Sequence, residues 1–367
     1  MSVSSQQNYS RLDRMFHRVA FSSPAVQVTA ADIERSLYGR RFTSIRTPKP
    51  VFITSLPRAG TTLMLELLGQ LPAFATSCYR DMPFVLAPLL WESLSRGFRK
   101  PAELAERAHA DGMAVGFDSP EAFEEVLWMT AWPEKFTAAG IALWGDHEDA
   151  AEFRGLLVSH MQRIIAARSN GSGGSRRYLS KNNANIARIG LLKRLFPDAA
   201  ILVPFRSPMD QAGSLLRQHL RFLEIHAEDA FARQYMEDIG HLEFGAAHRP
   251  IRFPGVEKAL ERYRPDTIDY WLAYWIAAFE HILRYRDSII LVSYGEVCEA
   301  GPRGVQAVAS CLDLPAESIE PLTRIELHSP RAHRDTLPND RALLTAADEL
   351  YRQLCANSVA LPQHATR

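Results

Sequence analysis

Residues 49–70 read KPVFITSLPRAGTTLMLELLGQ, and the order of residue types along this stretch indicates the fold. It begins with a short run of β-branched and aromatic residues bounded by prolines, which is typical of a buried strand. A tight turn with one glycine, Gly60, follows at once, and the leucine-rich segment after it has the composition of a helix. A strand, a tight turn and a helix in this order form a loop whose backbone N–H groups can bind a phosphate.

The rest of the chain repeats this alternation of strand and helix. Further strands are predicted at residues 74–78, 178–180, 199–205 and 288–292, and helical patterns lie between most of them. Regular alternation favours a parallel sheet with helices on both faces. The sequence therefore predicts an α/β, P-loop-like three-layer fold with a central parallel sheet flanked by helices.

Two regions stand outside this pattern. Residues 1–47 have amphipathic helical spacing and are predicted to form an N-terminal helical extension, which leaves residues 48–367 as a single α/β domain. Within that domain, residues 223–264 have an irregular pattern, and we expect them to be an insertion over one end of the sheet. Such insertions usually hold an acceptor substrate.

Composition excludes several classes of protein. The 367 residues include 42 Lys plus Arg and 42 Asp plus Glu, so nothing in the net charge indicates a nucleic-acid partner or an anionic membrane. Four widely spaced cysteines without a CxxC pair favour a reducing compartment. The sequence shows no signal peptide and no stretch of roughly 20 apolar residues. We therefore expect a cytoplasmic protein without integral membrane association.

The turn after the first strand differs from the loop of nucleoside-triphosphate enzymes, GxxxxGK[ST]. Ser55 stands where that motif has its first glycine, and Thr61 stands where it has lysine. Hydrolysis of ATP or GTP is disfavoured without that lysine. The cation of this loop is instead Arg58, just before Gly60, and Thr61 and Thr62 add hydroxyl donors at the N-terminus of the helix. The alternative is a simple proline-introduced turn capped by threonine.

A second segment, ILVPFRSPMDQAGSLLRQH at residues 201–219, has the same character. Arg206 lies at the end of a predicted strand, and Ser214 lies on the helix that follows. If the turn between them is tight, both side chains can hold one phosphate. The alternative is that Arg206 pairs with Asp210 and that Ser214 is a surface hydroxyl.

Together these segments resemble the sulfotransferase family that uses 3′-phosphoadenosine 5′-phosphosulfate (PAPS) as donor. Residues 50–68 look like its 5′-phosphosulfate loop, and residues 195–216 look like its 3′-phosphate segment. The arginine before Ala-Gly-Thr-Thr is most similar to tyrosylprotein sulfotransferases and related bacterial sulfotransferases. The resemblance assigns the 3′-phosphate to Arg206 and Ser214. It assigns the 5′-phosphosulfate to Pro57, Arg58, Ala59, Gly60, Thr61 and Thr62.

The resemblance implies four further site residues. Lys181 matches a family lysine near the sulfuryl group, and the alternative is a solvated loop lysine in a chain with only six lysines. Tyr294 lies where relatives keep a Tyr-Glu pair, and a core tyrosine is the alternative. Arg331 and Arg334 match a C-terminal basic segment that closes over the nucleotide in relatives, and surface arginines are the alternative.

The general base is left open by the sequence, which departs from the family pattern in two places. Tyrosylprotein sulfotransferases have an acidic base about twenty residues after the loop arginine, whereas the corresponding stretch here is CYRDMPF. Asp81 is the nearest carboxylate, with a salt bridge or a helix cap as its alternative role, and His109 is the other candidate base. Relatives also often have a second arginine where this chain has Gln218. If neither candidate is the base, the proton goes to water or to a residue in 223–264.

These observations predict a PAPS-dependent sulfotransferase that acts on a hydroxyl, or less often an amine, and releases 3′-phosphoadenosine 5′-phosphate (PAP). No metal ion is expected, because the acidic and histidine clusters lack a ligand spacing such as HExxH. One alternative is a small-molecule kinase, which the missing lysine disfavours. Another is a catalytically silent nucleotide-binding protein that serves partner interactions, which the missing glutamate favours. The expected partner is a small-molecule or peptide hydroxyl acceptor, and no pattern indicates an oligomeric state.

Overall fold

The computed structural model describes residues 11–96, 119–145, 147–169, 176–314, 319–320, 322 and 337–361, and the backbone of residues 105–106 and 114–115. The strands are β1 (Val51–Ile53), β2 (Phe74–Ala75), β3 (Ala105–Glu106), β4 (Ala114–Val115), β5 (Phe136–Thr137), β6 (Gly140–Ile141), β7 (Arg177–Lys181), β8 (Ala200–Phe205) and β9 (Ile290–Ser293). The α-helices are α1 (Arg11–Ala20), α2 (Pro24–Phe42), α3 (Thr61–Gly69), α4 (Pro88–Ser95), α5 (Glu125–Ala131), α6 (Ala151–Arg168), α7 (Ile189–Leu195), α8 (Pro208–Glu228), α9 (Ala230–Asp238), α10 (Val256–Arg262), α11 (Ile268–Leu283), α12 (Tyr294–Ala300), α13 (Pro302–Ser310) and α15 (Arg341–Ala356).

A five-stranded sheet forms the centre of the molecule, and its strand order is β2-β7-β1-β8-β9. Every pairing within it is parallel, as the alternation of strands and helices predicts. Two short antiparallel pairs, β3 with β4 and β5 with β6, lie outside this sheet. The expected α/β three-layer fold is therefore confirmed.

The side chains of the strands alternate between two hydrophobic cores, one on each face of the sheet. In β1, Val51 and Ile53 pack with the apolar face of α3, whereas Phe52 packs on the opposite face. In β8, Ile201 joins Phe52 and Leu202 joins Val51. Helices α3, α12 and α13 cover one face, and helices that include α6, α7, α8 and α11 cover the other. Burial on both faces explains why these strands are continuously apolar.

The central position of β1 determines where ligands can bind. Its neighbours are β7 on one side and β8 on the other, with Ile53 opposite both Lys181 and Leu202. The carboxyl ends of these strands therefore meet at one edge of the sheet. In open α/β sheets, the crevice beyond these ends, where the strand order reverses, is the usual ligand site.

Residues 223–264 are more regular than the sequence suggests. Helix α8 continues through Glu228, and α9 and α10 are both helical. The irregular sequence pattern therefore hides three helical segments, and the insertion over one end of the sheet stays a prediction. Phe231 and Met236, both buried, give α9 an apolar face, although the many charged residues around them obscure the pattern in the sequence.

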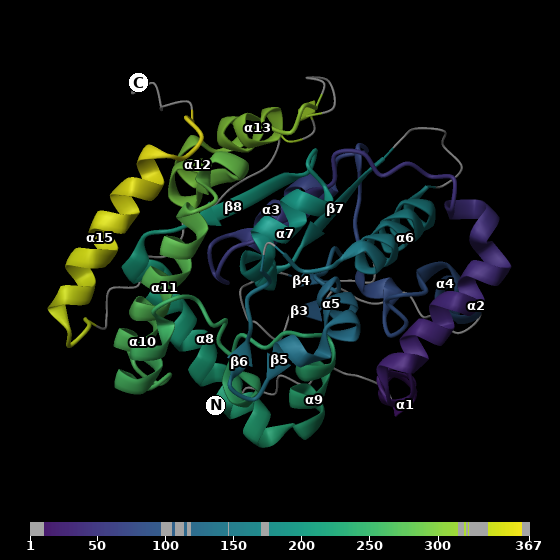
Figure 1. The fold of residues 1–367 in the computed structure, drawn as a ribbon, viewed down its shortest axis with the longest axis horizontal. Helices are drawn as coiled ribbons and strands as arrows, with labels where there is room; N and C mark the ends of the chain where they lie inside the picture. Colours follow the sequence, from purple (N-terminus) through teal and green to yellow (C-terminus); the bar gives the residue numbers. More distant parts are fainter. Residues whose placement is uncertain are drawn as a thin grey trace.

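The N-terminal helices lie along one end of the molecule, and α15 lies at the other (Figure 1). Helix α2 is fixed to α6 by an ion pair between Glu34 and Arg163, with Arg163 Nε 3.0 Å from Glu34 Oε1. Burial raises the pKa of the Glu34 carboxyl to about 7 despite the nearby guanidinium. Among the described helices, none combines the length and the apolar character needed to cross a bilayer.

Candidate active site

The loop between β1 and α3 has a backbone that approaches its neighbours closely. Arg58 and Gly60 both adopt positive φ angles, of 67° and 92° respectively. A Cβ atom built on Gly60 would lie 2.3 Å from the ring of Tyr294, so no other residue fits there without displacing that ring. The loop then enters α3 at Thr61, where the first N–H groups of the helix have no intrahelical partner. This arrangement suits a bound phosphate.

The two segments predicted to bind phosphates come together. Arg58 Nε donates a hydrogen bond of 3.1 Å to Ser214 Oγ on α8. Arg206 is 8 % exposed at the end of β8, and burial lowers the pKa of its guanidinium, partly countered by the carboxylate of Asp210. Arg58 and Tyr294 also lie close enough to influence Arg206 electrostatically. We call loop 55–62 together with Arg206 and Ser214 the phosphate cradle.

Tyr294 completes one wall of the cradle. It begins α12, directly after β9, and its ring covers Gly60. Burial raises the pKa of the Tyr294 hydroxyl to about 12, so it stays protonated at neutral pH and can donate a hydrogen bond.

Gln211 fixes the cradle to the helices behind it, which the sequence did not predict. Its Nε2 donates to the carbonyl oxygens of Leu56, at 3.2 Å, and Pro57, at 3.0 Å. Its Oε1 accepts from Trp275 Nε1 on α11 at 3.0 Å. Gln211 is fully buried, so the loop cannot move without breaking hydrogen bonds that water does not replace. The spacing of Gln211 from Ser207, one helical turn, is too common to single it out.

Lys181 and the two asparagines after it form the next part of the site. Lys181 ends β7 and is 7 % exposed, so it is not a solvated loop lysine. Asn183 connects this turn to the cradle, since its Oδ1 accepts a hydrogen bond of 3.3 Å from Thr61 Oγ1. The backbone oxygen of Asn183 also accepts from Thr54 Oγ1 at 3.2 Å.

Buried acidic residues at the start of α5 hold this turn in place. Asn182 Nδ2 donates to Glu125 at 2.6 Å, and Glu125 forms an ion pair with the fully buried Arg188. The guanidinium of Arg188 lies 3.9 Å from the centre of the Trp128 ring. Burial lowers the pKa of Arg188, and the charge of Glu125 opposes that shift. The result is a rigid platform beneath Asn182 and Asn183.

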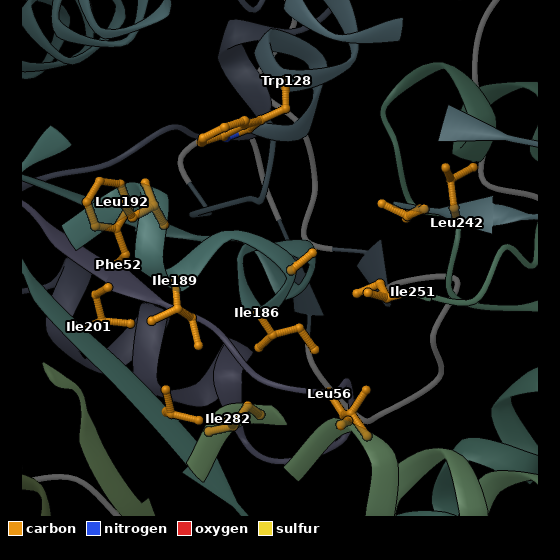
Figure 2. Close-up of a cluster of buried hydrophobic side chains, with 14 of the residues drawn as sticks. Phe52, Leu56, Trp128, Ile186, Ile189, Leu192, Ile201, Leu242, Ile251 and Ile282 are labelled. Carbon is orange, nitrogen blue, oxygen red and sulfur yellow. The ribbon is translucent and has the colours of Figure 1, made fainter. Parts of the chain in front are cut away.

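A cavity adjoins Lys181 and the cradle. We call it the Lys181 cavity, and its volume is about 30 Å³, room for one or two water-sized groups. Its polar lining includes Lys181, Asn183, His241 and Glu243. Its apolar lining includes Leu56, Ile186, Leu242, Ile251, Trp271 and Tyr274. Leu56, Ile186, Leu242 and Ile251 also belong to the main hydrophobic core, where Figure 2 shows Leu242 and Ile251 to one side of the cluster and Phe52 and Leu192 to the other.

The aromatic wall of the cavity is electrically neutral. Burial lowers the pKa of His248 to about 3, and its Nε2 lies 2.7 Å from the Tyr270 hydroxyl in a hydrogen bond. His219, behind Trp271, has its pKa lowered to about 4, also by burial. Burial raises the pKa of Tyr274 well above its ordinary value. None of these groups is charged at neutral pH.

Asp81 lies apart from the cavity, and its carboxylate already has two partners. It is 2 % exposed, forms an ion pair with Arg168 on α6, and accepts a hydrogen bond of 2.9 Å from the backbone N–H of Cys78. It caps the short 3₁₀ helix Tyr79–Asp81. This environment favours a structural role, with Arg168 rather than Arg80 as the partner.

Three residues predicted from the sequence, His109, Arg331 and Arg334, lie outside the described residues. The structure brings the other predicted phosphate-binding residues together. Arg58, Gly60 and Thr61 of the first segment lie close to Arg206 and Ser214 of the second, and all five belong to the cradle. In the part of the chain that the structure describes, no group of three or more His, Cys, Asp or Glu is arranged to hold a metal ion.

Glu243 was not singled out by the sequence analysis, although it lies in the block 223–264. It lies between the buried residues Leu242 and Phe244 and lines the Lys181 cavity. The signal that could have revealed it is a polar residue between two apolar ones in a short segment bounded by glycines, GHLEFG at residues 240–245.

Comparisons with known proteins identify the family of this chain. The sequence profile of the sulfotransferase family matches residues 50–318, which include the cradle and the Lys181 cavity. Among solved structures, sulfotransferase STF9 from Mycobacterium avium is similar over 96% of this chain and 87% of that chain, with 13% identity and a TM-score of 0.52. Sulfotransferase STF1 from Mycobacterium tuberculosis is similar over 92% of this chain and 80% of that chain, with 14% identity and a TM-score of 0.45. A search of curated sequences found no significant match. The family profile covers well over half of the chain, and the protein is therefore a member of the sulfotransferase family.

Proposed function

We propose that this protein transfers a sulfuryl group from PAPS to a hydroxyl group of a small acceptor and releases PAP, with an amine as the less favoured acceptor. The observation that carries this proposal is the hydrogen bond between Arg58 and Ser214. It joins the segment that resembles a 5′-phosphosulfate loop to the segment that resembles a 3′-phosphate site. One ligand with both phosphates can therefore contact both segments.

The residues of the cradle fit such a donor chemically. Arg58 and Arg206 are cationic, Thr62 and Ser214 carry hydroxyls, and the N-terminus of α3 adds backbone N–H groups. The Ser55 hydroxyl is buried and has no hydrogen-bond partner among the described residues, as expected of a group that awaits a ligand. When bound, PAPS supplies an activated sulfuryl group on a phosphate leaving group.

Each part of the site has a distinct role in this proposal. Arg58 and the N–H groups of α3 hold the phosphosulfate, whereas Arg206 and Ser214 hold the 3′-phosphate. Lys181 stabilises the negative charge that develops on the leaving oxygen. The Lys181 cavity receives the acceptor hydroxyl, and its apolar wall excludes water from the reaction. The small cavity, with its neutral aromatic wall, favours an uncharged alcohol or phenol.

The two alternative functions have less support. A kinase would need a cation at position 61, but Thr61 is there and its hydroxyl donates to Asn183. A catalytically silent binding protein would not need a cavity lined by Lys181 and Glu243 beside its nucleotide site. The cavity therefore favours a catalytic protein.

Thermal unfolding with PAP and AMP tests the donor assignment. A ligand that binds only the native state adds roughly 2.7 kcal/mol at a hundredfold excess over its Kd. We expect PAP to raise the melting temperature much more than AMP at equal concentration. Arg206→Ala should weaken PAP binding about 10- to 100-fold, because a charge-assisted hydrogen bond is lost.

Arg233→Ala provides the matched control, since Arg233 is an exposed residue of α9 that forms an ion pair with Glu237. This variant should bind PAP as the wild type does. Equal stabilisation by PAP and AMP in the wild type would contradict the 3′-phosphate assignment. Consumption of labelled PAPS in the presence of a panel of alcohols and phenols then tests the transfer itself.

A further inference from the structure

Glu243 is held in a fixed position at the rim of the Lys181 cavity. Gly240, at the start of its segment, has a φ of 77°, and a Cβ atom there would lie 2.4 Å from the side chain of Glu125. The segment is fixed further by a hydrogen bond of 2.8 Å from the N–H of His241 to the carbonyl of Met236. The carbonyl of Leu242 accepts a hydrogen bond of 2.7 Å from the N–H of Arg249. These contacts fix the backbone on both sides of Glu243.

A chain of two hydrogen bonds connects Glu243 to the phosphate cradle. Asn183 Nδ2 donates to Glu243 Oε1 at 2.9 Å, and Asn183 Oδ1 accepts from Thr61 Oγ1 at 3.3 Å. A carboxylate can only accept, so the amide must present its nitrogen to Glu243 and its oxygen to Thr61. The orientation of Asn183 therefore fixes the carboxylate relative to the loop.

The second carboxylate oxygen of Glu243 remains available. Oε2 accepts no hydrogen bond from any residue in the described part of the chain, although Glu243 lines the cavity. Glu243 is also only partly buried, so it keeps contact with solvent, to which a proton can be released. Asp81, by contrast, has both an ion pair and a backbone hydrogen bond.

From this arrangement we propose that Glu243 is the general base of the transfer, with Asn183 as the residue that positions it. The inference rests on the function proposed above. The O–H bond of the acceptor breaks and its proton goes to Glu243 Oε2. At the same time the acceptor oxygen uses its electron pair to form a bond to sulfur. The bond between sulfur and the 5′-phosphate oxygen breaks, and its electron pair leaves on that phosphate oxygen.

His241 is the rival in the same cavity. Its Nε2 lies 3.2 Å from the carbonyl oxygen of Ala122 and donates to it, so in the neutral ring Nδ1 is the acceptor. His241 is only 9 % exposed, but unlike Glu243 it has no hydrogen bond that leads to the cradle among the residues that the structure describes. The geometry therefore favours Glu243.

The test compares Glu243→Gln, Glu243→Ala and His241→Gln with the control Glu237→Gln, a partly exposed residue of α9 that pairs with Arg233. Single-turnover consumption of labelled PAPS is measured with 2-naphthol and 4-nitrophenol as acceptors, and PAP affinity is measured by calorimetry. We expect Glu243→Gln to lower the turnover rate at least about 100-fold, as loss of a general base does, with PAP affinity within about twofold of wild type. Glu237→Gln should match wild type in both measurements.

Formate provides a readout that a structural role would not move. In Glu243→Ala the missing carboxylate leaves space beside the acceptor hydroxyl, and added formate should restore part of the turnover in proportion to its concentration. Formate should not stimulate the wild type. Binding of 2-naphthol to the PAP-loaded Glu243→Gln variant, followed by naphthol fluorescence, should persist although turnover is lost.

Two results would overturn the assignment in distinguishable ways. Glu243→Gln turnover within about threefold of wild type, together with a large loss in His241→Gln, would assign the base to His241 and leave the sulfotransferase function intact. A wild-type protein that neither binds PAP nor consumes PAPS would overturn the proposed function, and the role of Glu243 with it.

Discussion

The phosphate cradle and the Lys181 cavity are neighbours, but they are built in different ways. The cradle consists of two short segments, loop 55–62 and residues 206–214, each of which follows a strand of the same sheet. The cavity shares Leu56 and Pro57 with that loop and takes most of its lining from Lys181 and the turn after β7, the segment 240–251, α11 and Ile141 of β6. A site made of short segments at strand ends can be predicted from the sequence. A site formed by the packing of elements that are distant in the chain cannot.

The difference also concerns charge. The cradle is lined by guanidinium groups and backbone N–H groups, which stay positive or polar at every physiological pH. The cavity is lined by one lysine, one arginine and one carboxylate, together with His241, a neutral His248 and aromatic rings. The first region suits an anionic donor, and the second suits a neutral acceptor whose proton must be removed.

The largest effect that we predict concerns Asp81, a charged residue that belongs to neither region. Asp81→Ala leaves the buried guanidinium of Arg168 without its partner, and breaking a buried ion pair costs about 3 to 5 kcal/mol. We expect a large drop in the free energy of unfolding, measured by urea denaturation, and unchanged turnover per folded molecule. Asp287→Ala, at a fully solvated position, should change neither quantity.

The opposite result for Asp81 would restore it as a catalytic candidate. A folded and equally stable Asp81→Asn protein with no turnover would show that this carboxylate takes part in the reaction, as the sequence suggested. The active site would then include a third region, near Cys78 and Arg168, besides the cradle and the cavity.

Lys181 lies where the two regions meet, because it ends a strand of the sheet and also lines the cavity. Its substitution therefore tests whether it serves donor binding or the transfer step. Lys181→Ala should lower turnover on the order of 10² to 10³, the usual cost of losing one donor to a developing charge. PAP affinity should change much less, because PAP lacks the sulfuryl group. Lys258→Ala, an exposed residue of α10, is the control. A loss of PAP affinity as large as the loss of turnover would make Lys181 a simple anchor of the cradle.

Much of the fold and of the cradle was predictable from the sequence. Three signals in the sequence are local: the β-branched runs, the single glycine at position 60 and the arginine after β8. Each predicts a strand or a turn whose conformation is determined by residues close to it in the chain. The parallel sheet follows from the alternation of these signals.

The cavity was not predictable, because no local pattern marks its residues. Glu243 acquires its neighbours only when the segment after α9 packs against α5 and the turn after β7, more than fifty residues away in the chain. The role of Gln211 could not be predicted from the sequence either, because it depends on contacts with Leu56, Pro57 and Trp275. For Asp81 the local signal was misleading. Its position near a strand end suggested catalysis, but its carboxylate forms an ion pair with Arg168 on α6, which is distant in the sequence.

The smallest effect that we predict separates the two regions by pH. The folded-state pKa of His248 is about 3 and that of His219 about 4, both below the ordinary value of about 6.5 that applies to the unfolded chain. The unfolded chain therefore binds more protons as the pH falls below about 6.5, and stability is lost progressively from there down to the folded-state values. Between about pH 7 and pH 5, each histidine should cost about 1 to 2 kcal/mol of stability.

His248→Gln keeps a polar partner for the Tyr270 hydroxyl but cannot titrate, so urea denaturation should show a smaller loss in this variant than in the wild type. His147→Gln, at an exposed position, should lose as much stability as the wild type. Equal losses in the wild type and in His248→Gln would mean that His248 has the same pKa in the folded and the unfolded chain, and the cavity wall would then gain a positive charge as the pH falls below about 6.5.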